Sequence, residues 1–310
     1  MKKILYIAAS LLFAACTHDE LLEYNPELTL MFQPSMYMHM THDNAEGFTQ
    51  DKDFAVFAWS LPHNAEWSKH SKQATEFLPT SVASCKDENG GKEGITSSLW
   101  SLDNEVLWPA TSERLTFMGY SPATFNCTCH PTDGVTCTMD VTTEQTDLLY
   151  TLPCSDREKL KDGGIVPLTF DHALCRLDLK MGHRVNSDEK ITIKSIYIDR
   201  ILHKGTFSSL HEPQWNLDDS YARFTLFEGS KELEKNPEPI GRYILLPPQK
   251  LATTITVKFE YTTAMQTSIT QTLKTVIMST NLKAGRTYTY TLSVGVDDVK
   301  FLQEIITNRL

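Results

Sequence analysis

Apolar residues that recur at every second position constrain this chain more than any other feature. Residues 254–261 alternate between a polar and an apolar side chain, which puts Ile255, Val257 and Phe259 on one face of a strand. Strands that bury one face and expose the other are typical of antiparallel sandwiches rather than parallel α/β sheets. Similar patterns predict strands at residues 28–32, 54–59, 115–120, 168–181, 191–198, 223–227, 243–246, 269–277 and 287–294. The chain is therefore predicted to be mainly β.

The composition narrows the class of protein further. A hydrophobic content of 41% with 10% aromatic residues is enough for sizeable cores, which argues against wholesale disorder and against a polytopic membrane protein. The 29 Lys and Arg residues against 39 Asp and Glu residues give a net charge of −10. This is the wrong sign for binding phosphate backbones, so nucleic acid is not expected as a partner.

The first residues resemble an export signal. Lys2 and Lys3 precede an apolar run of about ten residues, and small residues stand before Cys16. The run is shorter than the roughly 20 residues that span a bilayer. Residues 1–15 are therefore predicted to be a signal peptide. A cysteine at this place resembles the lipobox of bacterial lipoproteins, which implies acylation of Cys16; an ordinary secretory leader is the alternative.

Six further cysteines leave three alternatives open. An even number in an exported chain favours disulfides, but six cysteines allow 15 pairings and the sequence does not choose among them. The run from Cys127 through Cys129 to His130, followed by Cys137, offers soft metal ligands. Zinc knuckles place two residues between paired cysteines rather than one, so no metal site is assigned. Free thiols are the third alternative, and Cys175 is expected to pack as a small apolar residue.

A charged stretch near the middle of the chain is the best candidate for a domain boundary. Residues 156–162 are almost all charged and lead into Gly163 and Gly164, so this stretch has little apolar material for a core. We expect an N-terminal domain over residues 16–160 and a C-terminal domain over residues 161–310.

Sequence motifs of known catalytic sites are absent. The chain has no Gly-x-Ser-x-Gly elbow, no His-Glu-x-x-His helix, no phosphate-binding loop and no dinucleotide fingerprint. We expect no enzymatic activity and no cofactor. His172 follows Asp171 directly, but neighbours in a strand face opposite ways, so we predict a structural, hydrogen-bonded histidine rather than a catalytic dyad. Trp100, Trp108 and Trp215 could stack on sugars, although places in the core suit them better.

Six segments together resemble the fimbrillin (Mfa-like) family of Bacteroidales. The order and spacing of the segments agree with the family along nearly the whole chain, and the polar residues after Cys16 resemble an export tag for the cell surface. The segments are LWP at 107–109, LTFMGYSP at 115–122, QTDLL at 145–149, VPLTFDHALCRL at 166–177, YILLPPQ at 243–249 and LKAGRTYTY at 282–290.

The resemblance implies a fold and a mode of assembly. It implies two antiparallel β-sandwich domains in tandem, transthyretin-like with Greek-key connections, and a subunit or accessory lipoprotein of type V fimbriae at the outer membrane. Subunits of the family join by strand exchange, often after a protease removes the first strand. Leu28, Leu30 and Phe32 alternate as such a plug strand would. The implied partners are other fimbrillin subunits, the outer membrane through the lipid, and a ligand on a host or bacterial surface.

Two features depart from the family pattern. The maturation cut commonly follows an arginine, but no arginine precedes Arg114, which leaves Lys52, Lys69 and Lys72 as candidate cleavage sites. In the tail, Val299, Phe301 and Ile305 could alternate as a donor strand, yet the apolar spacing also suits a helix. Both departures favour a retained lipoprotein, such as an anchor, tip or accessory subunit, over a shaft subunit. A surface glycan-binding lipoprotein is the alternative function.

Overall fold

The structure is a computed structural model that describes residues 28–37, 48, 53–85, 99–109, 113–159, 163–209 and 212–308. Nearly all of its regular structure is β, which confirms the predicted fold class. Helix among the fully described elements is limited to the single turns α1 (Trp67–His70) and η1 (Ser71–Gln73). None of the helices within these ranges is long and apolar enough to cross a membrane.

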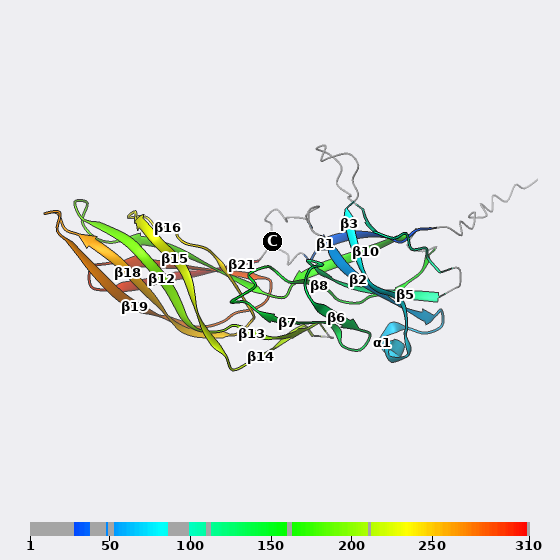
Figure 1. Cartoon of the computed structure of the whole chain (residues 1–310). Helices are drawn as coiled ribbons and strands as arrows, with labels where there is room; N and C mark the ends of the chain where they lie inside the picture. Colours follow the sequence, from blue (N-terminus) through cyan, green and yellow to red (C-terminus); the bar gives the residue numbers. More distant parts are fainter. Residues whose placement is uncertain are drawn as a thin grey trace, which may run out of the picture.

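The first half of the chain forms one sheet of eight strands (Figure 1). Its pairing order closes on itself, because β2 pairs with β3 on one edge and with β5 on the other. The interior is lined by one face of each strand and includes the fully buried Leu30, Phe54 and Phe170. The strands are β1 (Met31–Met36), β2 (Phe54–Pro62), β3 (Thr75–Cys85), β4 (Trp100–Leu102), β5 (Glu113–Ser121), β8 (Leu149–Thr151), β9 (Cys154–Arg157) and β10 (Ile165–His172).

The second half forms two sheets that pack face to face (Figure 1). In one of them, β11 (Cys175–His183) pairs with β16 (Glu238–Pro239), β17 (Ile244–Leu246) and β20 (Arg286–Val294), and β21 (Val299–Asn308) forms the outer edge. The other runs in the order β15 (Tyr221–Glu232), β12 (Lys190–Leu202), β18 (Lys250–Thr262) and β19 (Ser268–Asn281). Among the described strands, two pairs run parallel, β1 with β10 and β11 with β20, although alternation suggested antiparallel pairing.

A fourth sheet joins the two halves. β6 (Cys127–His130) and β7 (Gly134–Asp140) pair with β13 (Lys204–Ser208), which also pairs with β14 (Gln214–Leu217). One cluster of buried side chains continues from this junction into both halves. β10 lies in the first sheet although it follows residue 160, so strand pairing crosses the predicted boundary. The division into two domains remains a prediction.

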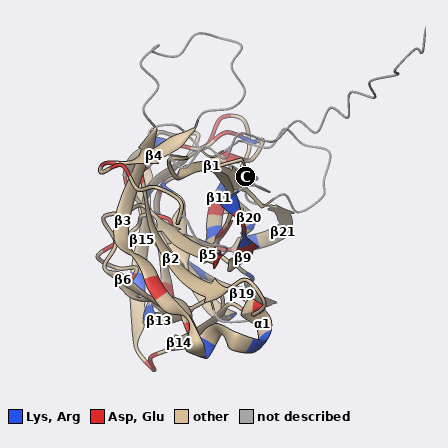
Figure 2. Ribbon diagram, turned by 90° about the vertical axis from the view of Figure 1, so that its right-hand side faces the viewer, with Lys and Arg blue, Asp and Glu red and all other residues tan. Residues whose placement is uncertain are grey.

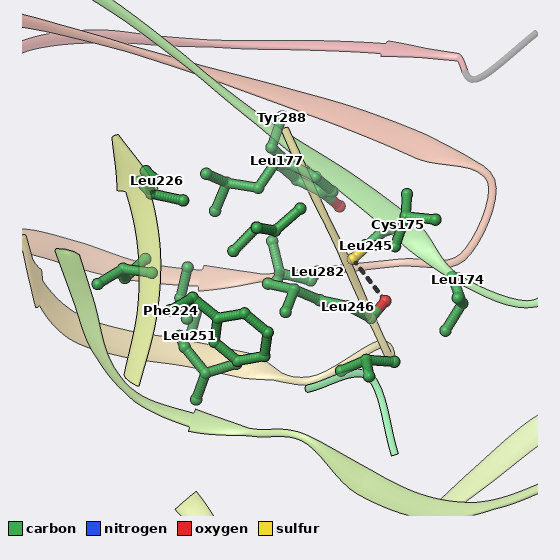
Figure 3. Close-up of a cluster of buried hydrophobic side chains, with 14 of the residues drawn as sticks. Leu174, Cys175, Leu177, Phe224, Leu226, Leu245, Leu246, Leu251, Leu282 and Tyr288 are labelled. Carbon is green, nitrogen blue, oxygen red and sulfur yellow. Dashed lines mark hydrogen bonds between the residues drawn. The ribbon is translucent and has the colours of Figure 1, made fainter. Parts of the chain in front are cut away.

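The single strand expected over residues 168–181 is wrong. β10 ends at His172 and β11 begins at Cys175, because the chain leaves the first sheet there and enters the other half. Ala173 and Leu174 are fully buried at this passage. Figure 3 shows the core beyond it, where the Sγ of Cys175 donates a hydrogen bond to the carbonyl of Leu246 at 3.2 Å. Cys175 thus packs among apolar side chains, as predicted.

Asp140, at the end of β7 in the joining sheet, is an ionised side chain whose hydrogen bonds make the stability of the fold depend on pH. The Oδ1 of Asp140 accepts hydrogen bonds from the backbone nitrogen of Thr142 at 2.9 Å and from Nδ1 of His203 at 2.8 Å. Burial opposes ionisation, but the hydrogen bonds from Thr142 and His203 outweigh it and lower the pKa of Asp140 to about 2. A carboxylate with a lowered pKa stabilises the folded state above its unfolded pKa of about 4, and this contribution is lost as the pH falls toward 2.

We therefore predict that Asp140→Asn lowers the free energy of unfolding at pH 7 by about 1 kcal/mol, a value reduced because the side chain is 32% exposed. The difference from the unmodified protein should vanish near pH 2. Urea unfolding of both proteins between pH 2 and 7 measures it. Asp133→Asn removes a carboxylate that is 65% exposed on the same hairpin and is the control. A difference that stayed constant over this pH range would contradict the prediction.

Candidate functional site

The predicted plug strand lies in the interior of the first sheet. Leu30 and Phe32 are fully buried, and Leu28 is partly buried against the same cluster. The ring of Phe32 meets Phe54 edge to face at a centroid distance of 5.9 Å and Phe117 at 5.8 Å. Burial of two large apolar side chains contributes about 3–6 kcal/mol. The alternation at residues 28–32 therefore places its apolar face in the core.

The backbone of the plug segment, residues 28–36, lies between two neighbouring parts of the sheet and forms hydrogen bonds with both. On one side, the nitrogen of Leu30 donates to the carbonyl of Val106 at 2.8 Å, and the nitrogen of Trp108 donates to the carbonyl of Leu28 at 2.9 Å. On the other side, β1 runs parallel to β10 over six paired residues. Without residues 28–36, β4 and β10 would each present an unpaired edge above an apolar groove.

The candidate cleavage sites differ in what a cut would release. Cys16 and Lys52 lie outside the described residues. Lys69 is in α1 and Lys72 is in η1, and both are exposed. Figure 2 shows α1 at the surface of the molecule. A cut after either of them would separate β2 together with β1, and β2 is paired along both edges. Of the three lysines, only Lys52 stands between β1 and β2.

The C-terminal segment is a strand and not a helix. β21 pairs antiparallel with the whole of β20, and Val299 and Phe301 turn toward the core, where Phe301 meets Tyr290 at a centroid distance of 5.7 Å. A bulge at Leu302 shifts the register. Beyond it, Ile305 and Ile306 are exposed by 42% and 52%. The opposite edge of β21 pairs with no strand in the described part of the chain.

An edge strand of ten residues with exposed leucine and isoleucine is a surface on which another strand can pair. The plug groove and β21 belong to different sheets in different halves of the molecule (Figure 1). One molecule thus carries a filled groove at one place and an open edge at another.

Two of the cysteines face each other across a hairpin. Cys127 of β6 is the direct partner of Cys137 in β7, and both are buried. A hydrogen bond to Cys137, together with burial, raises the pKa of the Cys127 thiol, and the same bond lowers the pKa of Cys137. Opposite residues of antiparallel strands have Cα atoms about 4.5–5.5 Å apart, within the range that a disulfide requires. The six described cysteines are unbridged in this structure.

We predict that oxidation by glutathione disulfide forms a disulfide bond between Cys127 and Cys137. The two thiols lose two electrons and two protons, and the oxidant becomes two glutathione thiols. The bond should raise the free energy of unfolding by about 2–3 kcal/mol, because it closes a short loop in the unfolded chain. Mass spectrometry of peptides before and after reduction locates it, and Cys127→Ser should abolish the gain. A bond from Cys127 to any other cysteine would contradict the prediction.

Comparison with known proteins agrees with this architecture. A family model described as fimbrillin-like matches residues 40–308. The fimbrium subunit Fim1C of Phocaeicola vulgatus is 24% identical over 127 residues, which are 39% of this chain and 31% of that protein. The chain thus spans about a third of the length of that curated relative.

Solved structures resemble the fold along nearly its whole length. A fimbrial protein from Bacteroides vulgatus superposes with a TM-score of 0.65 at 16% identity and covers 90% of this chain and 99% of its own. A proposed cell adhesion protein from Bacteroides uniformis gives a TM-score of 0.56 at 13% identity, over 92% of this chain and 98% of its own. At these identities, the likeness concerns the fold.

Proposed function

The chain belongs to the fimbrillin-like family, and from this premise we propose that it is a non-enzymatic subunit of a cell-surface fimbria. We propose further that a lipid on Cys16 holds it at the outer membrane and that it joins other fimbrial subunits by exchange of strands. The name of the relative from Phocaeicola vulgatus, a fimbrium subunit, supports the first part.

The observation that carries the proposal is the filled groove. The segment of residues 28–36, which includes β1, supplies Leu30 and Phe32 to the core of the first sheet. Along the chain, this segment precedes all the other strands of that sheet. A strand of this kind can leave and be replaced without moving any other strand. Its place would suit an incoming strand with apolar residues at alternate positions.

Whether β1 fills the groove determines how many other subunits this subunit can join. A chain whose own β1 fills its groove can offer a strand but cannot accept one, so it must stand at one end of a fibre. The segment before β1 leads to Cys16, the proposed lipid site. We therefore propose an anchor subunit that keeps β1, with the fibre growing from its other half.

β21 is the strand that this subunit would offer. It is an edge strand, and its exposed residues include Leu302, Ile305 and Ile306, which leave apolar surface in water. Natural edge strands usually carry charges or proline that discourage pairing, and β21 has Lys300 and Glu304. Its exposed apolar positions would nevertheless suit a partner's groove.

The test is the intact mass and N-terminal residue of the protein recovered from its native cell surface. The proposal predicts an acylated Cys16 at the start of an uncut chain. A chain that begins after Lys52 would show that β1 is removed and would overturn the anchor role. A start after Lys69 or Lys72 would overturn it as well, because β2 would then be lost with β1.

A further inference from the structure

A polar cavity of about 710 Å³ lies where the two halves of the chain meet. Its lining comes from segments far apart in the sequence: the end of β5, the loop before β8, the end of β10, and the outer face of the sheet formed by β17, β11, β20 and β21. The volume is within the range of small-ligand sites. None of the residues discussed for strand exchange in β1 lines it.

Strand register explains why this sheet face is polar. Leu245, Arg176, Thr287 and Thr307 are successive partners across the four strands, and Asp178 is the partner of Thr289 in the next row. Their neighbours in sequence, among them Leu177 and Tyr288, turn to the opposite face and are buried in the core. The polar side chains therefore point outward as a group and form one wall of the cavity.

A tyrosine and an arginine stack on each other in this wall. The guanidinium carbon of Arg176 lies 4.1 Å from the centroid of the Tyr243 ring, and Nε of Arg176 donates to Oδ1 of Asp178 at 3.0 Å. Tyr243 is 47% exposed. The arginine thus holds one face of the ring, which leaves apolar ring surface toward the solvent.

A buried histidine on the facing wall presents a polar atom without a partner. Nδ1 of His172 donates to Oδ2 of Asp147 at 2.5 Å, since a carboxylate can only accept. The side chain of His172 is 9% exposed, and its Nε2 is buried without a hydrogen bond to any described residue. A buried nitrogen of this kind costs free energy unless something binds to it. The predicted structural role of His172 is met by the hydrogen bond from Nδ1 to Asp147.

The charges of the cavity select the ligand. Asp147 and Asp178 would repel an anion, and Arg176 would repel a cation, so a neutral ligand meets the smallest electrostatic cost. The hydroxyls of Thr287, Thr289 and Thr307 can each donate or accept a hydrogen bond. We propose that this cavity binds a neutral saccharide, with the sugar's apolar face against Tyr243 and its hydroxyls toward the threonines. Thr307 belongs to β21, the strand proposed for exchange, so binding is measured on the uncut chain, in which β21 is paired with β20.

The experiment titrates the full chain with D-galactose, D-glucose, D-mannose and N-acetyl-D-glucosamine, followed by saturation-transfer NMR. D-glucuronic acid and N-acetylneuraminic acid form the acidic comparison set. We expect at least one neutral sugar to bind saturably. Tyr243→Ala and Thr289→Val should each weaken that binding at least ten-fold, which corresponds to about 1.4 kcal/mol. Both changes affect side chains at the surface of the cavity, so the fold should persist.

Tyr221 provides a matched control, because it is 51% exposed and also stacks with an arginine, Arg200, at 5.2 Å. Tyr221→Ala should leave binding unchanged. The proposal is overturned if none of the four neutral sugars binds or if only the acidic sugars bind. It is also overturned if binding survives both Tyr243→Ala and Thr289→Val, since the sugar would then occupy another place.

Discussion

Removal of β1 is expected to turn a monomer into a polymer. With a site-specific protease sequence placed between β1 and β2, the cut chain can be separated from the released strand in mild denaturant. Removal exposes the groove once filled by Leu30 and Phe32, along with the edges of β4 and β10. Each molecule then carries both an empty groove and its own β21, so chains should join head to tail. Light scattering after size-exclusion chromatography measures the mass.

Polymerisation must be distinguished from the aggregation of a damaged protein. A synthetic peptide of residues 28–37 should occupy the groove and keep the stripped chain monomeric. The same peptide with Phe32→Asp should fail, because it would place a charge in an apolar core. The uncut chain treated with the same protease is the second control. A stripped chain that stays monomeric, or one that aggregates equally with both peptides, would contradict the account.

Charges at two exposed positions of β21 are expected to abolish this assembly while the fold remains intact. Ile305→Lys combined with Ile306→Lys changes two exposed side chains, so the free energy of unfolding of the uncut chain should change by less than about 1 kcal/mol. Neighbouring residues of a strand face opposite ways, so one of the two lysines would be buried as a charge in a neighbour's groove whichever face of β21 enters it. The association constant of the stripped chains should fall more than a hundred-fold, which is about 2.8 kcal/mol.

The control for this variant is an apolar residue on a different edge. Val276 lies on the edge strand β19 and is 69% exposed, so Val276→Lys tests whether any apolar edge drives assembly. It should leave polymerisation unchanged. Equal loss of polymer with Val276→Lys, or normal polymer with the β21 variant, would show that β21 is not the donor.

The sequence predicts the strands whose two faces differ most. Residues 254–261 and 287–294 form the middle of β18 and most of β20, because a strand with one buried face must alternate. Leu30 and Phe32 are buried for the same reason. β3 is missed, because its residues are mostly polar or partly exposed and Pro79 interrupts the pattern. Strand direction is not encoded in alternation, so the parallel pairs could not be foreseen.

The structure of the tail and the lining of the cavity depend on contacts between distant segments, which the local sequence pattern does not predict. Leu302, Ile305 and Ile306 fit a helix because a bulge interrupts the period of the strand, and only pairing with β20 decides the outcome. The cavity brings together side chains from three separate segments, because β10 ends where β11 begins and β17 pairs with the start of β11. These side chains are Asp147, His172, Arg176 and Tyr243. Trp100 and Trp108 are 2% exposed, in agreement with the core positions preferred from the sequence, and the exposed ring in the cavity is the tyrosine Tyr243.

We propose that β1 occupies a groove that another subunit's strand can fill. Amide hydrogen exchange at Trp108 tests it most directly, because the nitrogen of Trp108 donates to the carbonyl of Leu28 in the plug segment. The account predicts slow exchange in the uncut chain, fast exchange once β1 is removed, and slow exchange again in the polymer. Fast exchange at Trp108 in a fully assembled polymer would contradict it, since the subunits would then be joined through some other surface.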